Sequence, residues 1–260
     1  AAVTADKPSI AVLGGTGQEG SALSARWTRA GYRVVIGSRD AARAEATAKM
    51  LNQGNGSGLA VGADLVGAAR TGDIVVLAVP FAAQAATLSL VRAELIGKIL
   101  VDVTVPLVPP KVSRVQLPEG GSAVLKAQAL LGGQVKVVSA FQNVSYEALQ
   151  QLDQPVDCDV LVCGDDADAR EAVIELARDA GMRAWHAGPL VNSTAVEALT
   201  SLLIFMNIRY KSHRAGIRVN GLGAESEARR LHLVALPGLP EVQPGDDLPA
   251  LVLAGVERSR

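Results

Sequence analysis

Three glycines near the start of the chain have the spacing of a nucleotide-binding turn. Gly15, Gly17 and Gly20 form a G-x-G-x-x-G motif directly after the apolar run 10–13. In this motif the first glycine permits a tight turn, the second lets the backbone approach a pyrophosphate, and the third lets helix and strand pack closely. The helix that follows offers free N–H groups and a positive dipole end to phosphates. The motif predicts a dinucleotide site; a glycine-rich packing turn is the alternative.

The next expected strand ends in residues that select the dinucleotide. A site for NAD usually has an aspartate or glutamate there, which accepts from the ribose 2′-hydroxyl. This chain has Ser38, Arg39 and Arg43 instead. Two arginines four residues apart at a helix start repel each other by about 0.2–0.5 kcal/mol and oppose the helix dipole. A 2′-phosphate removes both penalties, which favours NADP(H). The alternative is a solvated helix start with Ser38 as its N-cap.

Composition argues against several other classes of protein. The chain has 260 residues, a formal net charge of −1 and 49% hydrophobic residues, so nothing in its charge favours nucleic acid or an anionic membrane as a partner. Cys158 and Cys163 are too far apart for a C-x-x-C pair, and we expect buried, inert thiols and no metal site. No run of about 20 apolar residues and no secretory signal is recognised, which predicts a cytoplasmic protein without a membrane span.

Short apolar runs alternate with helical patterns, which is typical of βαβ units. The expected strands cover residues 10–13, 33–36, 74–78, 99–102, 135–140, 160–163 and 182–185, with a short further strand at 59–61. The expected helices cover residues 21–30, 41–51, 82–94, 122–131 and 166–180. These elements predict an α/β fold of the Rossmann type: a doubly wound, mainly parallel sheet with helices on both faces.

A last long helix is expected over residues 195–211. Thr194 and Glu197 have the spacing of a capping box at its start. The pattern changes near Gly223, where a charged stretch leads into a Pro/Gly-rich tail that is too short to bury a core of its own. We therefore expect an NADP-binding domain over residues 1–223 and a linker with a short tail over 224–260.

Ligands in this fold lie across the carboxyl ends of the strands. The expected strand ends are Val79-Pro80, Thr104-Val105, the segment from Phe141 to Val144, and the segment 188–190. They are apolar and contain almost no titratable groups. His186 is interpreted as a surface residue, and His213 lies beyond the strands.

Asp165 and Asp166 are interpreted as helix caps rather than catalytic carboxylates. Reduction of a carbonyl or imine usually needs a proton donor beside the hydride path. Hydride exchange between two redox cofactors needs mainly two oriented rings and exclusion of water. The scarcity of acids and bases at the strand ends favours the second reaction, without a catalytic side chain.

Motifs along most of the chain resemble the coenzyme F420-dependent NADP reductase family. The resemblance covers nearly all of residues 9–222 and rests on Leu-Gly14-Gly-Thr16-Gly17, Val-Ile-Gly-Ser38-Arg39, Val79-Pro80, Val-Val-Ser139-Ala140, Val-Cys163-Gly164-Asp165-Asp166, Ala187-Gly188-Pro189-Leu190 and Gly216-Ile-Arg-Val. Each motif is weak alone, and the set is specific. Members of the family are homodimers that pass a hydride between reduced deazaflavin and NADP. The resemblance implies an NADP-dependent oxidoreductase with coenzyme F420 as co-substrate.

The resemblance also implies roles for individual residues. NADP would be held by Thr16, Gln18 and Glu19 of the glycine turn, together with Ser38, Arg39 and Arg43. The nicotinamide and deazaflavin rings would be lined by Val79, Pro80, Val105, Phe141, Gln142, Asn143 and Val144. Archaeal members have a histidine where this chain has Gln142, so the part which that histidine plays in holding the deazaflavin stays open here.

The tail resembles a second family of the same metabolism. Residues 234–248 are similar to the opening of the F420-0:γ-glutamyl ligase family, which builds the glutamate tail of the coenzyme. The similar stretch is too short to hold a ligase site. A truncated fusion and a degenerate remnant are both compatible with it, and both imply deazaflavin metabolism.

Two other functions stay open. One is an NADPH-dependent flavin or ferric-type reductase, because the cytoplasmic domains of transmembrane ferric reductases share the Gly-Ser-Arg and Cys-Gly-Asp elements. The other is a non-catalytic protein that binds NADPH through the same glycines.

Overall fold

Runs of valine, isoleucine and leucine form the strands of one sheet. In this computed structural model, which describes residues 7–56 and 58–222, the sheet order is β3-β2-β1-β4-β5-β6-β7-β8. The strands are β1 (Ile10–Leu13), β2 (Val34–Ser38), β3 (Ala60–Asp64), β4 (Ile74–Leu77), β5 (Ile99–Asp102), β6 (Lys136–Ser139), β7 (Asp159–Gly164) and β8 (Arg183–His186). All neighbours are parallel except β6 and β7. The predicted doubly wound, mainly parallel sheet is confirmed.

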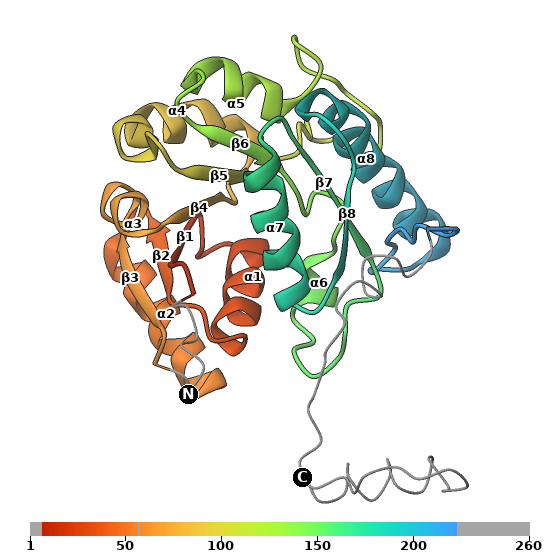
Figure 1. Cartoon of the computed structure of the whole chain (residues 1–260). Coiled ribbons are helices and arrows are strands. Elements are labelled where there is room, and N and C mark those ends of the chain that lie inside the picture. The colour runs from red at the N-terminus through yellow and green to blue at the C-terminus, as the bar shows by residue number, and fades with distance from the viewer. Residues whose placement is uncertain (1–6, 57, 223–260) are drawn as a thin grey trace, which may run out of the picture. The chain divides into compact units, whose positions relative to one another are not determined.

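Helices connect the strands and cover both faces of the sheet (Figure 1). They are α1 (Gln18–Arg29), α2 (Ala41–Asn55), α3 (Leu65–Thr71), α4 (Phe81–Val91), α5 (Ala123–Leu131), α6 (Tyr146–Leu149), α7 (Ala167–Asp179) and α8 (Ser193–Tyr210), with 3-10 turns at Arg92–Leu95 and Leu190–Asn192. The sequence patterns predicted all but α3 and α6. Both missed helices are short, and helices of one or two turns carry little periodicity.

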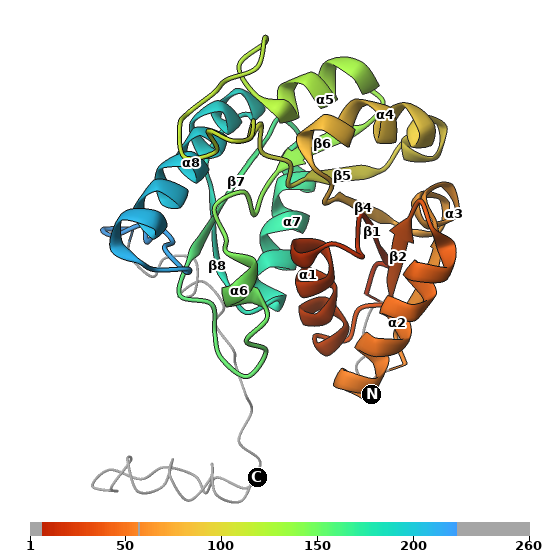
Figure 2. The same cartoon turned by 180° about the vertical axis from the view of Figure 1, so that it is seen from behind.

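Alternate strand residues point into two separate hydrophobic cores. In β1, Ile10 and Val12 belong to one core, while Ala11 and Leu13 belong to the other. The first core includes side chains of α1, α2 and α7, and the second includes side chains of α3, α4 and α5. Figure 2 shows the same layers from behind. This two-sided burial explains why the strands are apolar without alternation.

The sheet order reverses between β1 and β4. From β1 the chain runs outward through β2 to β3, then returns to β4 on the other side of β1 and continues outward. The carboxyl ends of β1 and β4 therefore diverge into loops that leave in opposite directions, which creates the crevice where ligands bind in such sheets.

The start of α8 differs from the expected capping box. Asn192 is the N-cap residue, and no side chain caps the helix. Glu197 instead crosses to another helix, where its carboxylate accepts from the main-chain N–H groups of Ala123 and Val124 at 2.7 and 3.1 Å. The prediction was wrong because the first turn of α5 needs acceptors as much as α8 does, and Glu197 is buried between the two helices.

The chain divides into a unit of residues 1–218 and a second unit of 219–260. Of the second unit, residues 219–222 are described, and they contain no helix or strand. The boundary expected at residue 224 stays a prediction. The ligase-like stretch 234–248 lies outside the described residues.

Candidate active site

The glycine motif forms the turn between β1 and α1 as predicted. Gly17 is the N-cap of α1, and no side chain caps this helix start. A Cβ atom on Gly20 would come within 2.7 Å of the carbonyl oxygen of Gly14. Gly14 has a φ of +84°, so it provides the left-handed residue of the turn, a position that the sequence pattern assigned to Gly15. The turn thus has no side chain at Gly14, Gly15 or Gly17, beside the first N–H groups of α1.

The residues expected at the 2′-phosphate lie together at the end of β2. Ser38 is the last residue of this strand, and Arg39 and Arg43 are exposed. Asp40, not Ser38, caps α2, because its carboxylate accepts from the N–H of Arg43 at 3.1 Å. Neither guanidinium forms a hydrogen bond or ion pair with a residue that the structure describes. Two neighbouring cations without an anion partner are suited to a phosphate.

A cavity of about 800 Å³ opens beside the glycine turn, at the carboxyl ends of β4, β5 and β6. Of the residues predicted to bind cofactors, it is lined by Gly17, Gln18, Glu19, Val79, Pro80, Val105, Gln142, Asn143 and Val144. The structure therefore brings together residues from three separate loops and the start of α1. Thr16 and Gly15 lie in the turn but not on the cavity wall.

Phe141 is placed differently from the expectation. Its side chain is fully buried in the core, edge-on to Trp27 with the ring centroids 5.8 Å apart. Its φ of +73° turns the chain, so that the three residues after it reach the cavity. Phe141 thus contributes to the site through its backbone, because the apolar ring is better buried against Trp27 than in an open cavity.

Titratable groups surround the cavity more closely than the sequence suggested. Glu19, Tyr146, Glu147 and His213 all line it. Glu147 lies on the short helix α6 and is 3.7 Å from His213, which follows α8. The expectation of a site nearly free of ionisable groups was wrong at its rim, because α6 and the segment after α8 were not recognised as neighbours of the strand ends.

The helix α8 contributes a further wall that the sequence did not reveal. Thr200, Leu203, Ile204 and Asn207 line the cavity. Their spacing of three and four residues places them on one helix face. That periodicity was visible in the sequence, but it indicates only a buried face and not what the face covers.

The segment 188–190 does not join the site. Since β7 runs antiparallel to β6, and β8 is parallel to β7, β8 ends at the opposite edge of the sheet. There the carboxylate of Asp165 accepts from the N–H of Leu190, and Asp166 caps α7 through the N–H of Ala169. The interpretation of Asp166 as a cap is confirmed. His186 is exposed, as expected.

The two thiols behave as the sequence predicted. Cys158 and Cys163 are both buried and unbridged, and burial raises the pKa of both. A thiol held protonated in this way is a poor nucleophile and metal ligand. Within the described part of the chain, no group of three histidine, cysteine or acidic side chains has the geometry of a metal site.

Glu197 is 1% exposed, and desolvation raises its pKa to about 7 against the opposing effect of the two N–H groups of α5. Since the folded-state pKa exceeds the ordinary value of 4.5, the contribution of this group to stability is complete below pH 4.5 and is lost as the pH rises through 7. Glu197→Gln removes this titration.

As the pH rises from about 5 to about 8, we therefore expect the free energy of unfolding of the wild type to fall, on the order of 2 kcal/mol, relative to that of the Gln variant. Urea unfolding of both proteins at the two pH values measures it. A difference between the proteins that is the same at both pH values would contradict the assignment.

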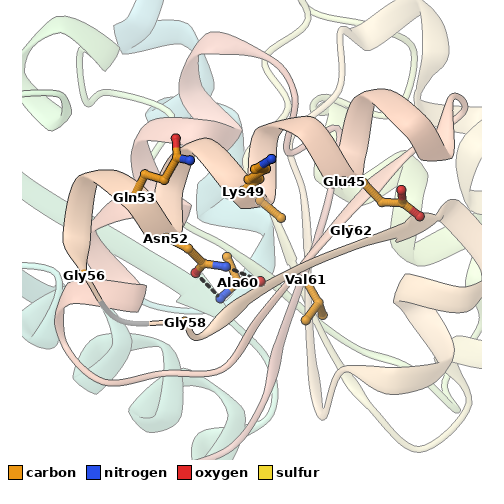
Figure 3. A pocket seen from close by; sticks show the side chains of 10 residues that line it. Glu45, Lys49, Asn52, Gln53, Gly56, Gly58, Ala60, Val61 and Gly62 are labelled. Atoms are coloured by element: carbon orange, nitrogen blue, oxygen red, sulfur yellow. Dashed lines mark hydrogen bonds between the residues drawn. The ribbon is translucent and has the colours of Figure 1, made fainter.

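A second hollow of about 580 Å³ lies between α2 and the edge strand β3 (Figure 3). Asn52 lines this hollow, and its side chain donates to the carbonyl of Ala60 at 2.8 Å and accepts from the N–H of Ala60 at 2.9 Å. The Asn52 amide thus pairs with main-chain groups of the edge strand β3 that a further strand would otherwise bind. None of the predicted site residues lies in this hollow.

One helical stretch among the described residues, Leu190–Tyr210, is long and apolar enough to cross a membrane by length and composition, with a mean hydropathy of 1.3. The sequence pattern predicts a helix over 195–211 but no membrane span. A core or interface helix passes the same test, so this feature is weak evidence for a span. Its buried Glu197, bound to α5, and its cavity-lining residues are both features of a helix that packs within a protein.

Comparison with known proteins identifies the family of this chain. The family profile "NADP oxidoreductase coenzyme F420-dependent" matches residues 9–106. The F420-dependent NADP reductase of Methanocaldococcus jannaschii is 42% identical over 221 residues, which are 82% of this chain and 98% of that protein. The rat metalloreductase STEAP3 is 30% identical over 204 residues, which are 78% of this chain but only 38% of that protein.

Among solved structures, a protein from Arthrobacter sp. FB24 assigned as an F420-dependent NADP-reductase superposes with a TM-score of 0.69 and 25% identity, covering 82% of this chain and 99% of that one. By this similarity over nearly the full length of its relatives, the chain belongs to the family of F420-dependent NADP reductases.

Proposed function

We propose that this protein transfers a hydride between NADP(H) and the deazaflavin coenzyme F420. The observation that carries the proposal is the cavity of about 800 Å³, whose wall joins the glycine turn and the start of α1 to the loops after β4, β5 and β6. Hydride exchange between two cofactors depends on orientation and exclusion of water more than on acid–base catalysis. The inner walls, from Val79, Val103, Val105 and Val144, are apolar and suit this requirement.

At the NADP end, the first turn of α1 would hold the pyrophosphate through its free N–H groups. Glu19 lies in this turn, is only partly exposed, and has its pKa raised to about 8 by desolvation. A neutral Glu19 would not repel the pyrophosphate and would be able to donate a hydrogen bond to it. Ser38, Arg39 and Arg43 would hold the 2′-phosphate.

At the other end, the loops after β4, β5 and β6 would hold the nicotinamide and the deazaflavin against each other. Val79, Pro80 and Val105 supply apolar contacts, and Gln142, Asn143 and Val144 supply the facing wall. When bound, the deazaflavin provides the carbon that gives or takes the hydride. The protein's part is to hold both rings and to keep water away from them. Gln142 brings a side-chain amide to this wall.

Mixing the purified protein with oxidised F420 and NADPH tests the function. We expect loss of the visible absorbance of the deazaflavin with NADPH and far slower loss with NADH. No loss of absorbance while NADPH still binds would overturn the proposal. Reduction of a flavin or of ferric iron, without reduction of F420, would then favour the alternative reductase, and inertness toward all acceptors would favour a binding protein.

We also propose that the protein works as a homodimer through the outer face of α8. Leu202, Phe205 and Met206 are about half exposed, at 53%, 54% and 45%. At 100° per residue they lie opposite the face that lines the cavity. An apolar stripe of this kind on a long helix favours a self-complementary contact with a second copy.

Phe205→Asp is expected to convert the dimer to a monomer, because it places a charge in the centre of the apolar stripe. Light scattering coupled to gel filtration measures the mass. Gln53→Asp, which adds the same charge to the exposed surface of α2, is the control and should leave the mass unchanged. A wild type that is monomeric at micromolar concentration would contradict the dimer.

For cellular context, we propose a cytoplasmic protein that needs neither a membrane nor nucleic acid. The formal net charge of −1 and the contact of Glu197 with α5 support this proposal.

A further inference from the structure

A buried carboxylate lies directly behind the cavity and has no part in the function described so far. Asp102 is the last residue of β5 and is fully buried. Its two side-chain oxygens accept from two different donors: the N–H of Thr104 at 2.9 Å and the side-chain amide of Gln84 at 2.6 Å. Gln84 lies in the first turn of α4, next to cavity-lining residues 80–82. The carboxylate thus joins the loop after β5 to the start of α4.

The main chain of Asp102 reaches a third part of the cavity. Its carbonyl accepts from the side-chain amide nitrogen of Gln142 at 2.7 Å. Both Thr104 and Gln142 line the cavity and are almost fully buried. Because the nitrogen of Gln142 is committed to this carbonyl, its Oε1 atom is turned elsewhere, and it has no partner among the described residues. A buried acceptor without a partner is destabilising, so a ligand N–H that reaches it gains affinity.

Two further contacts link this group to the helix that forms the far wall. The amide of Gln84 also donates to the carbonyl of Ala123, whose N–H is bound by Glu197 of α8. Thr200 of α8 donates to the carbonyl of Gln142 at 2.8 Å. The hydrogen bonds from Thr200 through Gln142, Asp102 and Gln84 to Glu197 therefore begin and end on α8. They tie together the loop after β5, the loop after β6, the start of α4 and the helix α8.

We propose that Asp102 is a positioning residue for the ring site, where it holds Thr104, Gln84 and Gln142 in the arrangement that receives the deazaflavin. This inference rests on the proposed function. Asp102 does not touch the cavity itself, and it acts by fixing the orientation of the residues that do. This position requires a side chain with two acceptor oxygens, because Thr104 and Gln84 each present an N–H donor to it.

Asp102→Asn is the sharpest change, because it keeps the size of the side chain and removes one acceptor. One of the two donors then faces the new NH₂ group, and the loop after β5 or the start of α4 must shift. Such a shift is expected to lower the hydride-transfer rate constant by about tenfold or more, because the rate depends steeply on the placement of the reacting rings. We expect that loss in single-turnover reduction of F420, together with a larger primary isotope effect from 4-deuterated NADPH.

Binding gives a second readout that does not depend on turnover. Titrating F420 fluorescence with the protein in its NADP⁺ complex should show an affinity about fivefold or more weaker in the variant. The Kd for NADPH alone should stay within about twofold, since the glycine turn and the arginines take no part in this network.

Asp159→Asn is the matched control. Asp159 is equally buried, and its carboxylate binds Arg183 and Trp185 away from the cavity. This variant should lose stability but keep the F420 affinity and the isotope effect of the wild type. An Asp102→Asn protein within twofold of the wild type in rate constant and F420 affinity overturns the inference, as does an equal loss in the Asp159 control. A wild type that fails to reduce F420 would instead overturn the proposed function.

Discussion

Replacing Arg39 and Arg43 together with alanine is expected to weaken NADPH binding about 100-fold and to change NADH binding by less than about twofold. Each guanidinium would form charge-assisted hydrogen bonds to a 2′-phosphate, which NADH lacks. Both side chains are exposed and bind no described residue. Their removal should therefore leave the free energy of unfolding unchanged, and a change in nucleotide affinity can be assigned to the binding site. The change also removes the repulsion between the two arginines and so should not destabilise α2.

Kd values for NADPH and NADH, measured by quenching of protein fluorescence or by calorimetry, decide the outcome. Lys49→Ala is the control, because it removes a positive charge from the same helix at an exposed position further from β2. It should affect neither nucleotide by more than about twofold. Equal losses for NADPH and NADH in the double variant would contradict the assignment of these arginines to the 2′-phosphate.

The second large effect is expected at a residue outside the site. Arg26 lies on α1, is 6% exposed, and has no carboxylate partner among the described residues. Its guanidinium donates to five main-chain carbonyls, those of Ala148, Leu149, Gln151, Gln154 and Ala180. Burial lowers its pKa, and the ring of carbonyl dipoles offsets part of that cost. Through these hydrogen bonds, Arg26 connects α1 to α6, to the loop after α6 and to the end of α7.

Arg26→Leu leaves those carbonyls without donors in a buried place. We expect the free energy of unfolding to fall by about 3 kcal/mol or more. Arg29→Leu, one turn along the same helix, should change it by less than about 1 kcal/mol, because its ion pair with Asp153 is exposed on both sides. Urea unfolding of the two variants measures the contrast. Equal losses would show that Arg26 contributes no more than a surface cation.

The local patterns of the sequence predicted the strands, most helices and the residues that we propose for the NADP end of the site. Strand β1 and the turn that follows are encoded by one contiguous segment of the sequence, and so is the Ser-Arg end of β2. The physical requirement at these positions is local: a backbone without side chains near a phosphate, or a cation near a strand end. Such requirements restrict residue types directly, which is why spacing alone revealed them.

The direction of β7 was not available from the sequence. An apolar strand reads the same whether it pairs parallel or antiparallel, since both choices bury the same side chains. The long return between β6 and β7 decides it, and as a result the segment 188–190 lies at the far edge of the sheet. Phe141 is a similar case, because an aromatic residue at a strand end fits a ring site and a core equally well until Trp27 is placed beside it.

The polar network behind the cavity depended wholly on the tertiary structure. Glu197 meets Ala123 across 74 positions of the chain, and Gln142 meets Asp102 across 40. A carboxylate at residue 197 satisfies the rule for a capping box locally, yet the N–H groups that it binds belong to another helix. Hydrogen-bond donors and acceptors are chosen by which groups are buried together, and burial is a property of the assembled layers. The residues that we propose to bind phosphate were therefore predicted by the sequence pattern, and the hydrogen-bond partners behind the proposed ring site were decided only by the tertiary structure.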